Sequence, residues 1–330
     1  MLTCTPHSFA HACADAEAWW TAAQGTARLF ARDATLWTAA DESQWLGWLD
    51  LTDLEPASVQ ALRTQLAPVR RLPAEAVVLL GMGGSSLGAE VMARVLPRGP
   101  DGLPLHVVDT LHPDAVLDRF DALRWDRTLV IAASKSGGTL EPAVLLALAR
   151  QRLTAACGEA GLRRIIAITD PGSALDREAQ QDGFGAIVHG RPTVGGRFSM
   201  LSPFGLVPAL LLDAPIEALR HALLALRLAV RDERQLHDAQ RLGLAIATAA
   251  MQGRDKLIVH LPRALGPLGA WIEQLVAESL GKRGRVVLPV VDEPSVAAVR
   301  GGNDRLHLRV GLSGDPRDGA GDAAGSDDAA

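Results

Sequence analysis

Apolar residues in the first seventy positions recur at intervals of three and four. Trp19 and Trp20, and later Trp45 and Trp48, are the largest of them. This spacing is typical of helices that bury one face, because residues three and four apart lie on the same side. An aromatic platform for a ligand is the alternative, but such stripes are more often buried packing. We therefore predict an N-terminal helical layer over residues 1–70.

Between residues 71 and 212 the pattern changes to short, continuous apolar runs separated by helical stretches. Such runs are typical of a parallel sheet built from βαβ units, in which the strands are buried on both faces. The expected strands are Val77–Leu80, Leu105–Val108, Leu129–Ala132 and Ile165–Ile168. Open parallel sheets bind ligands beyond the carboxyl ends of their strands, so we expect the chemistry at that edge.

Residues 213–310 predict a second, smaller or partial α/β domain. A long helical segment, Ala214–Gln252, comes first. The expected elements after it are a strand from Leu257, a helix over Gly266–Lys282 and a strand over Val286–Val291. The fold class is therefore α/β, with doubly wound parallel-sheet domains and an N-terminal helical layer.

The last segment, residues 311–330, consists mainly of Gly, Ala, Asp and Ser. This composition cannot bury enough apolar area to offset the entropy of ordering the chain. We therefore predict a disordered acidic tail.

Composition and charge limit the function further. The 330 residues are 48% hydrophobic and 22% charged, as in a globular enzyme, and the net charge of -5 gives no basic surface for nucleic acid. Cys4, Cys13 and Cys157 form no CxxC pair, which argues against a disulfide framework and a zinc site. With no leader and no long apolar run, we predict a cytoplasmic protein that contacts neither nucleic acid nor membrane.

The first candidate ligand loop lies in VVLLGMGGSSLGAE, Val77–Glu90, which runs from a strand through a glycine-rich turn into a helix. Free backbone N–H groups and the positive helix end favour an anion there. Ser85 and Ser86 add hydroxyl donors. A tight turn without a ligand is the structural alternative.

A dinucleotide fold is a second alternative for this segment. Gly81 and Gly83 begin a GxGxxG pattern, and Asp109 ends the next expected strand where a ribose-binding acid would lie. Ser86, however, occupies the place of the third glycine.

The second candidate loop, in IAASKSGGTLEPA, repeats the arrangement at a neighbouring strand end. It contains Ser134, Lys135, Ser136 and Thr139 before another helix. A phosphate monoester has three acceptor oxygens and can use two sets of donors, whereas a dinucleotide enzyme has no need of the second set. The pair of loops therefore favours a sugar-phosphate type of ligand.

Four motifs in order, GMGGSSLG, SKSGGTLE, GGRFSMLSPFG and QLVAESLGK, resemble those of the glucose-6-phosphate isomerase family, whose members contain two sugar isomerase domains. The similarity is greatest to the isomerase half of bacterial transaldolase and glucose-6-phosphate isomerase fusions. These share a run like ARDATLWTAADESQWLGWLDL, and the resemblance covers about Arg28 to Val310.

This resemblance implies roles for particular residues. The positions that match the family's sugar-phosphate loops are Gly84, Ser85, Ser134, Lys135, Ser136 and Thr139. Arg197 matches an active-site arginine, Gln274 a substrate-contacting glutamine and Glu278 the catalytic base. Without the resemblance, Arg197 is either a fixed cation beside Gly195 and Gly196, which let backbone approach a ligand, or a surface arginine after a turn. Glu278 would be a solvated carboxylate four residues from Lys282.

The activity implied is interconversion of glucose 6-phosphate and fructose 6-phosphate through a cis-enediol, with no metal or other cofactor. Glu278 would move the proton between C2 and C1 while Arg197 stabilises the enediolate oxygen. The number of subunits is left open, with a homodimer as one assembly.

The sequence departs from the family after Glu278. The family's ring-opening histidine and C-terminal lysine have no counterpart motif, and His307 reads as a structural residue on a strand. The hypotheses are an active isomerase, a shortened isomerase, a non-catalytic or weakly active sugar-phosphate-binding protein, and an NAD-dependent oxidoreductase. The motif order argues against the last, and an intact Glu278 and Arg197 argue against a pure sensor.

Overall fold

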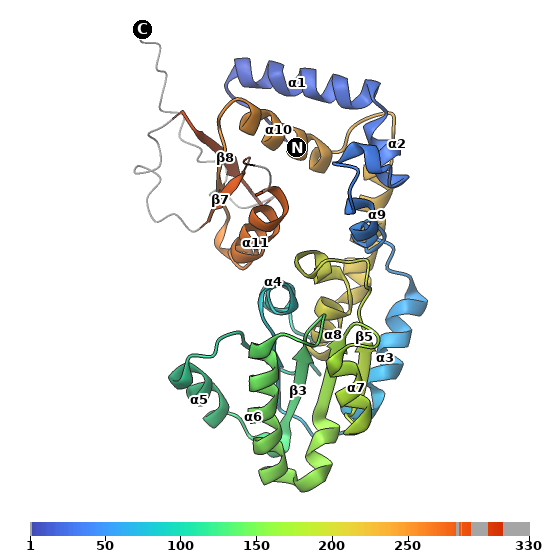
Figure 1. Cartoon of the computed structure of the whole chain (residues 1–330), viewed down its shortest axis with the longest axis vertical. Coiled ribbons are helices and arrows are strands. Elements are labelled where there is room, and N and C mark those ends of the chain that lie inside the picture. The colour runs from blue at the N-terminus through green and yellow to red at the C-terminus, as the bar shows by residue number, and fades with distance from the viewer. Residues whose placement is uncertain (1, 282–283, 285, 292–302, 313–330) are drawn as a thin grey trace. The chain divides into compact units, whose positions relative to one another are not determined.

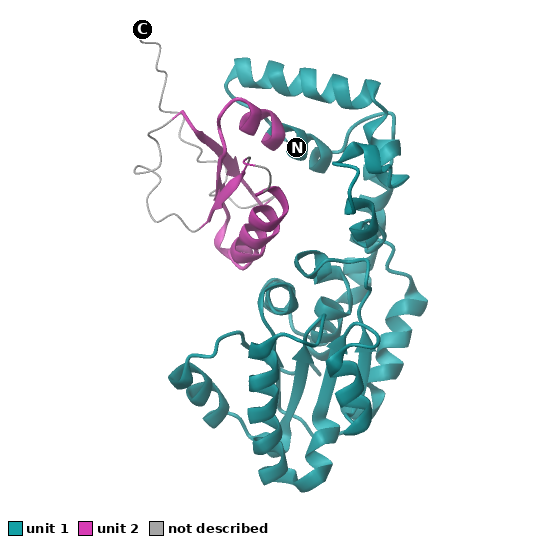
Figure 2. Ribbon diagram, viewed as in Figure 1, with its two compact units in different colours: residues 1–245 teal, residues 246–330 magenta. Residues whose placement is uncertain are grey.

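A computed structural model describes residues 2–281, 284, 286–291 and 303–312 of the chain (Figure 1). The chain divides into two compact units, residues 1–245 and residues 246–330 (Figure 2). The predicted helix end at Lys282 and most of the predicted tail, from residue 313 on, lie outside the described residues.

The N-terminal region is helical, as predicted. It contains α1 (His7–Ala22), α2 (Gly25–Phe30) and α3 (Pro56–Arg70), with three short 3-10 turns between α2 and α3. Helix α3 begins with a proline at its first turn, where no backbone N–H is needed. These turns of the first seventy residues are η1 (Ala34–Leu36), η2 (Glu42–Trp45) and η3 (Gly47–Asp50).

The tryptophans of this region do not all pack as a core stripe. Trp19 and Trp45 are largely exposed. Trp20 covers Gly25 so closely that a Cβ there would lie 2.2 Å from the indole, and its Nε1 donates to Thr26. The packing interpretation therefore holds for part of the pattern only.

The first unit is built on a five-stranded parallel sheet in the order β2-β1-β3-β4-β5. Its strands are β1 (Ala76–Leu80), β2 (Leu105–Val108), β3 (Thr128–Ala133), β4 (Ile165–Thr169) and β5 (Ala186–His189). All four predicted strands are confirmed to within one residue at either end. The fifth, with the sequence AIVH, was not predicted, although it is as long as β2.

Helices cover both faces of this sheet, which confirms the doubly wound class (Figure 1). Leu79 and Ile131 point to one face, and Leu80 and Val130 to the other, as the alternation of a strand requires. One face is covered by α3, α4 (Leu87–Val95) and α8 (Pro203–Leu211). The other is covered by α5 (Pro113–Asp121), α6 (Leu140–Cys157) and α7 (Ala174–Gln181), with η5 (Trp125–Arg127) and η6 (Gly158–Arg164) between them.

The long helical segment predicted over Ala214–Gln252 is two helices, α9 (Ile216–Val230) and α10 (Asp238–Met251). The break falls in the polar stretch RDERQLH, where Arg234 bonds Asp232 instead of continuing a helix. Helix α9 belongs to the same compact unit as the first sheet, whereas it was predicted to belong with residues 213–310. The predicted four-part domain division stays a prediction.

The second unit contains a three-stranded parallel sheet in the order β7-β6-β8. Its elements are β6 (Lys256–His260), η8 (Arg263–Leu265), α11 (Leu268–Leu280), β7 (Leu288–Val290) and β8 (Arg305–Arg309). Leu257 and Val259 of the central strand form its small core with Val287. The smaller α/β unit predicted here is therefore present, and His307 lies on a strand as expected.

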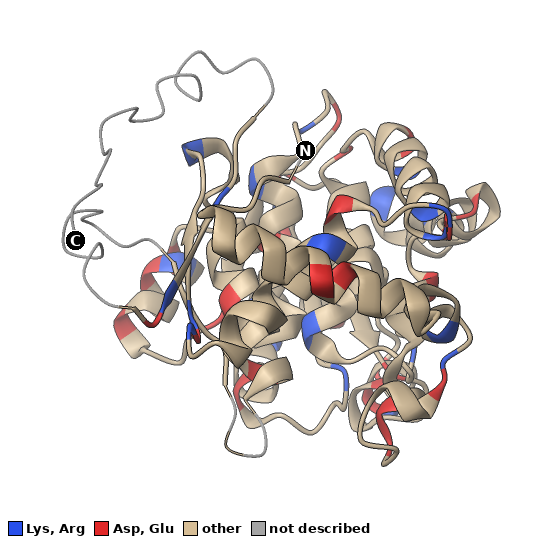
Figure 3. Ribbon diagram, turned by 90° about the horizontal axis from the view of Figure 1, so that it is seen from above, with Lys and Arg blue, Asp and Glu red and all other residues tan. Residues whose placement is uncertain are grey.

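Acidic and basic residues are interspersed along the chain (Figure 3). In the part of the chain that the structure describes, no helix has the length and apolar character needed to cross a bilayer. That the protein contacts neither nucleic acid nor membrane stays a prediction.

The sheet core predicts a large difference between two identical leucine truncations. Leu129 is fully buried in β3, and Leu228 is 66% exposed on α9. Leu129→Ala should lower the free energy of unfolding by about 2 to 5 kcal/mol, because it leaves a cavity in a packed core. Leu228→Ala should change it by less than about 0.5 kcal/mol. Urea denaturation measures both, and equal effects would contradict the assigned core.

Candidate functional site

The strand order places two of the predicted loops at one point of the sheet. β1 pairs directly with β3, and the chain leaves β1 for β2 on one side and returns to β3 on the other. The carboxyl ends of β1 and β3 are therefore the point where the direction of connection reverses, and sheets of the order 2-1-3-4-5 bind ligands at that point. A dinucleotide fold has a different order, 3-2-1-4-5-6, so the topology disfavours that alternative.

The first loop, residues 81–86, follows β1 and includes the 3-10 turn η4 (Gly83–Ser85). Ser86 is fully buried, and its Oγ donates to the carbonyl oxygen of Gly83 over 3.1 Å. The expectation that Ser86 offers its hydroxyl to a ligand is therefore wrong. Ser85, which is partly exposed, remains as the hydroxyl candidate of this loop.

The second loop, residues 134–139, follows β3 and leads into α6. Ser134 is 5% exposed, and its Oγ accepts a hydrogen bond from the Gly137 backbone N–H. Gly137 has a φ of +67°, a left-handed conformation that favours glycine. Ser136 and Thr139 are exposed, and Thr139 immediately precedes the first turn of α6. The loop thus presents hydroxyls next to the positive end of an 18-residue helix.

Lys135 of the second loop is held by protein groups. Its Nζ forms an ion pair with the carboxylate of Asp170 and donates to the carbonyl oxygen of Pro192 over 3.2 Å. The Asp170 backbone N–H in turn donates to the Lys135 carbonyl oxygen over 3.0 Å. The ammonium therefore joins the end of β4 to the segment that leads to Arg197.

The third loop, residues 190–198, meets the first loop through backbone atoms. A Cβ on Gly84 would lie 2.2 Å from the carbonyl carbon of Gly196, so only glycine fits there. Ser199, just beyond the third loop, donates its hydroxyl to the Gly84 carbonyl oxygen over 2.9 Å. The guanidinium carbon of Arg197 lies 5.1 Å from the centre of the Phe198 ring, within cation–π range.

The turn that leads into α7 supports the second loop. A Cβ on Gly137 would lie 2.6 Å from the Leu175 backbone nitrogen, so the loop rests on the start of α7. There, Asp176 accepts hydrogen bonds from His189 and from the Gly172 backbone N–H. These bonds lower the pKa of the Asp176 carboxyl to about 2, with the His189 bond as the largest cause. Asp176 is therefore ionised at neutral pH and holds this turn together.

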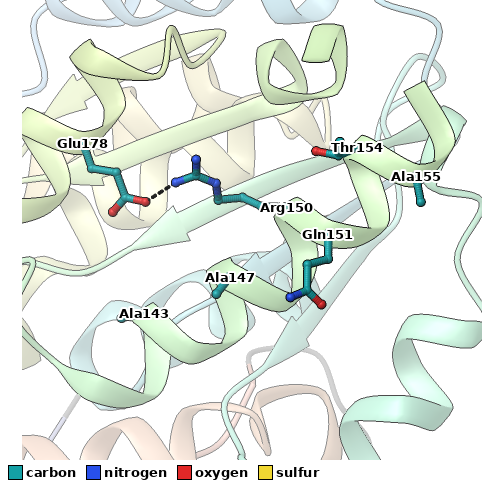
Figure 4. A pocket seen from close by; sticks show the side chains of 7 residues that line it. All are labelled: Ala143, Ala147, Arg150, Gln151, Thr154, Ala155 and Glu178. Carbon is teal, nitrogen blue, oxygen red and sulfur yellow. Dashed lines mark hydrogen bonds and ion pairs between the residues drawn. The ribbon is translucent and has the colours of Figure 1, made fainter. Parts of the chain in front are cut away.

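A hollow of about 620 Å³ lies nearby, between α6 and α7 (Figure 4). Arg150 points into it, but its guanidinium is already paired with Glu178 and with Asp182, the latter over 2.6 Å. An arginine with two carboxylate partners has little free charge for a phosphate. We therefore place the candidate site at the loops and not in this hollow.

Gln274 and Glu278 belong to the second unit. They lie one turn apart on α11, and the Gln274 Nε2 donates to the Glu278 Oε1 over 3.2 Å. This contact puts both side chains on one face of the helix, as the i and i+4 spacing predicts. Their part in the chemistry stays a prediction, as does that of every residue assigned from the resemblance.

No cluster of three or more His, Cys, Asp or Glu side chains suited to a metal ion occurs among the described residues. That the chemistry needs no metal stays a prediction.

Comparison with known proteins identifies the family. A family model described as phosphoglucose isomerase matches residues 73–286. The chain belongs to the phosphoglucose isomerase family. The match begins just before β1 and ends beyond α11, so it spans all three loops as well as Glu278.

Curated relatives agree with the family. A glucose-6-phosphate isomerase of Synechococcus sp. (strain CC9605) is 35% identical over 217 residues, which are 63% of this chain and 40% of that protein. One of Thermus thermophilus is 32% identical over 266 residues, 76% of this chain and 59% of that protein. The chain thus spans about half the length of such relatives. The closer likeness to fusion proteins stays a prediction.

Solved structures share the fold. A hypothetical protein of Thermus thermophilus superposes with a TM-score of 0.74 at 27% identity, covering 92% of this chain and 73% of that one. A glucose-6-phosphate isomerase of Chlamydia trachomatis gives a TM-score of 0.60 at 24% identity, with 72% and 48% covered. The second likeness supports the fold alone.

Two residues at the site were not found from the sequence. Ser199 lies inside a quoted motif, GGRFSMLSPFG, but nothing in the pattern shows that its hydroxyl reaches Gly84. Asp170 follows β4, and its partner Lys135 lies at the end of the neighbouring strand β3. An acid and a base that each follow adjacent parallel strands were the available signal for this pair.

The contact between the first and third loops predicts the effect of a single methyl group. Gly84→Ala should lower the free energy of unfolding by about 1 to 3 kcal/mol, because the methyl would overlap the Gly196 backbone. Gly138→Ala is the matched control, since its nearest neighbour, the Ser136 Oγ, would be 4.0 Å away. Urea denaturation compares the two. A Gly84→Ala protein as stable as Gly138→Ala would show that the loops do not touch as described.

Proposed function

We propose that this chain binds the phosphate of an aldose or ketose 6-phosphate at the first and second loops and interconverts glucose 6-phosphate and fructose 6-phosphate. The observation that carries the proposal is the meeting of the three loops at the β1 and β3 ends, fixed by the Ser199 to Gly84 bond. The name of the curated relatives, glucose-6-phosphate isomerase, supports the same reaction.

Phosphate binding would use the donors that the loops leave available. These are the hydroxyls of Ser85, Ser136 and Thr139 and the backbone N–H groups at the start of α6. Ser134 shapes the second loop through its bond to Gly137, and its own hydroxyl hydrogen remains for a ligand. Lys135 acts through Asp170 and Pro192 and contributes its backbone to the loop.

The chemical step is proton transfer within one sugar. Glu278 removes the proton from C2 of the open-chain aldose while the C1 carbonyl oxygen gains a proton, which gives a cis-enediol. The same carboxyl then delivers its proton to C1 as the C2 hydroxyl loses one, which gives the ketose. Arg197 stabilises the negative oxygen that develops between the two states, and no outside oxidant or reductant takes part.

A second candidate is a sugar-phosphate-binding protein with little or no turnover. This candidate is supported by the partial match to the curated relatives, because the chain covers only 40% and 59% of their lengths. Both candidates need the loops, but only the isomerase needs the base at Glu278.

Exchange of the C2 proton separates the candidates. We expect the wild type to exchange the C2 proton of glucose 6-phosphate with heavy water, followed by NMR. Glu278→Gln should bind the sugar phosphate with unchanged affinity, because the amide keeps the shape, yet exchange about a hundredfold to ten thousandfold more slowly. Glu273→Gln, on the same helix, is the matched control and should behave as wild type.

Binding without exchange in the wild type would leave only the binding protein. Equal exchange in the wild type and Glu278→Gln would remove Glu278 from the mechanism. No binding of glucose 6-phosphate would contradict both candidates.

A further inference from the structure

The tryptophan-rich segment that precedes α3 has no part in the function proposed so far. Within it, Trp48 is partly buried and stacks on Phe198, with ring centres 5.5 Å apart and ring planes at 13°. Trp45, three residues earlier in the same segment, is 47% exposed and bonds only to Asp41 among the hydrogen bonds that the structure describes. Two tryptophans of similar sequence context thus have different surroundings.

Backbone contacts fix the position of Trp48 relative to the third loop. Leu46 forms an antiparallel bridge with Val194, and the Gly47 N–H donates to the Thr193 carbonyl oxygen over 3.1 Å. A Cβ on Gly47 would lie 2.2 Å from the Thr193 Oγ1, so the two segments are in close contact. The segment before α3 therefore lies along the third loop and fixes its path up to Phe198.

Phe198 connects Trp48 to Arg197. One face of the Phe198 ring carries the guanidinium of Arg197 within 5.1 Å, and the ring also stacks on the Trp48 indole. An aromatic ring held by a stacked neighbour has fewer conformations, and a cation resting on it is restrained in the same way. Trp48, Phe198 and Arg197 thus form a row of flat groups that begins in the N-terminal layer and ends at the candidate site.

We propose that Trp48 is a positioning residue for Arg197. By stacking on Phe198 it keeps the guanidinium where negative charge develops on the substrate. The inference rests on the proposed function, in which Arg197 faces the reacting end of the sugar and the first and second loops face the phosphate. Trp48 should therefore raise the affinity for ligands with a negative charge at C1, and it should not affect binding of the phosphate group alone.

Two ligands isolate this effect without requiring turnover. 6-Phosphogluconate has a carboxylate at C1, and sorbitol 6-phosphate has a neutral hydroxyl there, with the same phosphate at the other end. Isothermal titration calorimetry on the full chain would measure both affinities. Trp48→Ala should lower the affinity for 6-phosphogluconate about tenfold, which is the effect of loosening one charge-assisted hydrogen bond. The same substitution should lower the affinity for sorbitol 6-phosphate by less than about twofold.

Three further variants give the test its controls. Trp48→Phe keeps a stacking ring and should restore the affinity for 6-phosphogluconate, which also guards against a Trp48→Ala protein that fails to fold. Trp45→Ala, the matched control, should leave both affinities unchanged. In an Arg197→Ala background, Trp48→Ala should cause no further loss, because residues that act as one unit are not additive.

Equal weakening of both ligands by Trp48→Ala, or full additivity with Arg197→Ala, would show a general structural role and overturn the inference while the proposed function stands. Failure of the wild type to bind either ligand would instead overturn the proposed function, and the inference with it.

Discussion

The close approach of Gly84 to Gly196 is the contact on which the candidate site depends. The two backbones meet where a single Cβ would overlap, and Ser199 locks them by donating its hydroxyl to the Gly84 carbonyl oxygen. A backbone contact of this kind leaves little freedom, because packed interiors do not deform continuously. It fixes the distance between the loop after β1 and the loop that carries Arg197.

The sheet and the N-terminal layer supply the rest of the frame. The strand order brings the ends of β1 and β3 side by side, and the Lys135 to Asp170 pair links β3 to β4. Trp48 supports the third loop through Phe198. Parts of the chain that are distant in sequence thus converge on residues 190–198. Under the proposed function such rigidity would serve catalysis, because binding energy at the phosphate end would position the reacting end.

The sequence predicted most of the sheet because its central strands are buried on both faces. Runs such as TLVIAA in β3 are apolar on both sides and stand out from the flanking sequence, whereas β5, at the edge of the sheet, was missed. The roles of neighbouring serines could not be distinguished from the sequence. Ser85 and Ser86 have the same chemistry, and only the buried bond from Ser86 to Gly83 shows that one of them is structural. The Ser199 hydroxyl reaches Gly84, which lies far from it in the sequence, and a single-sequence pattern carries no signal for that contact.

A crystal structure of the full chain with 6-phosphogluconate tests the central claim most directly. The claim predicts phosphate density within hydrogen-bond reach of the Ser136 and Thr139 hydroxyls and of the first backbone N–H groups of α6, with the loop at Gly84 unmoved. Phosphate density in the hollow between α6 and α7, with Arg150 released from Glu178 to bind it, would contradict the account.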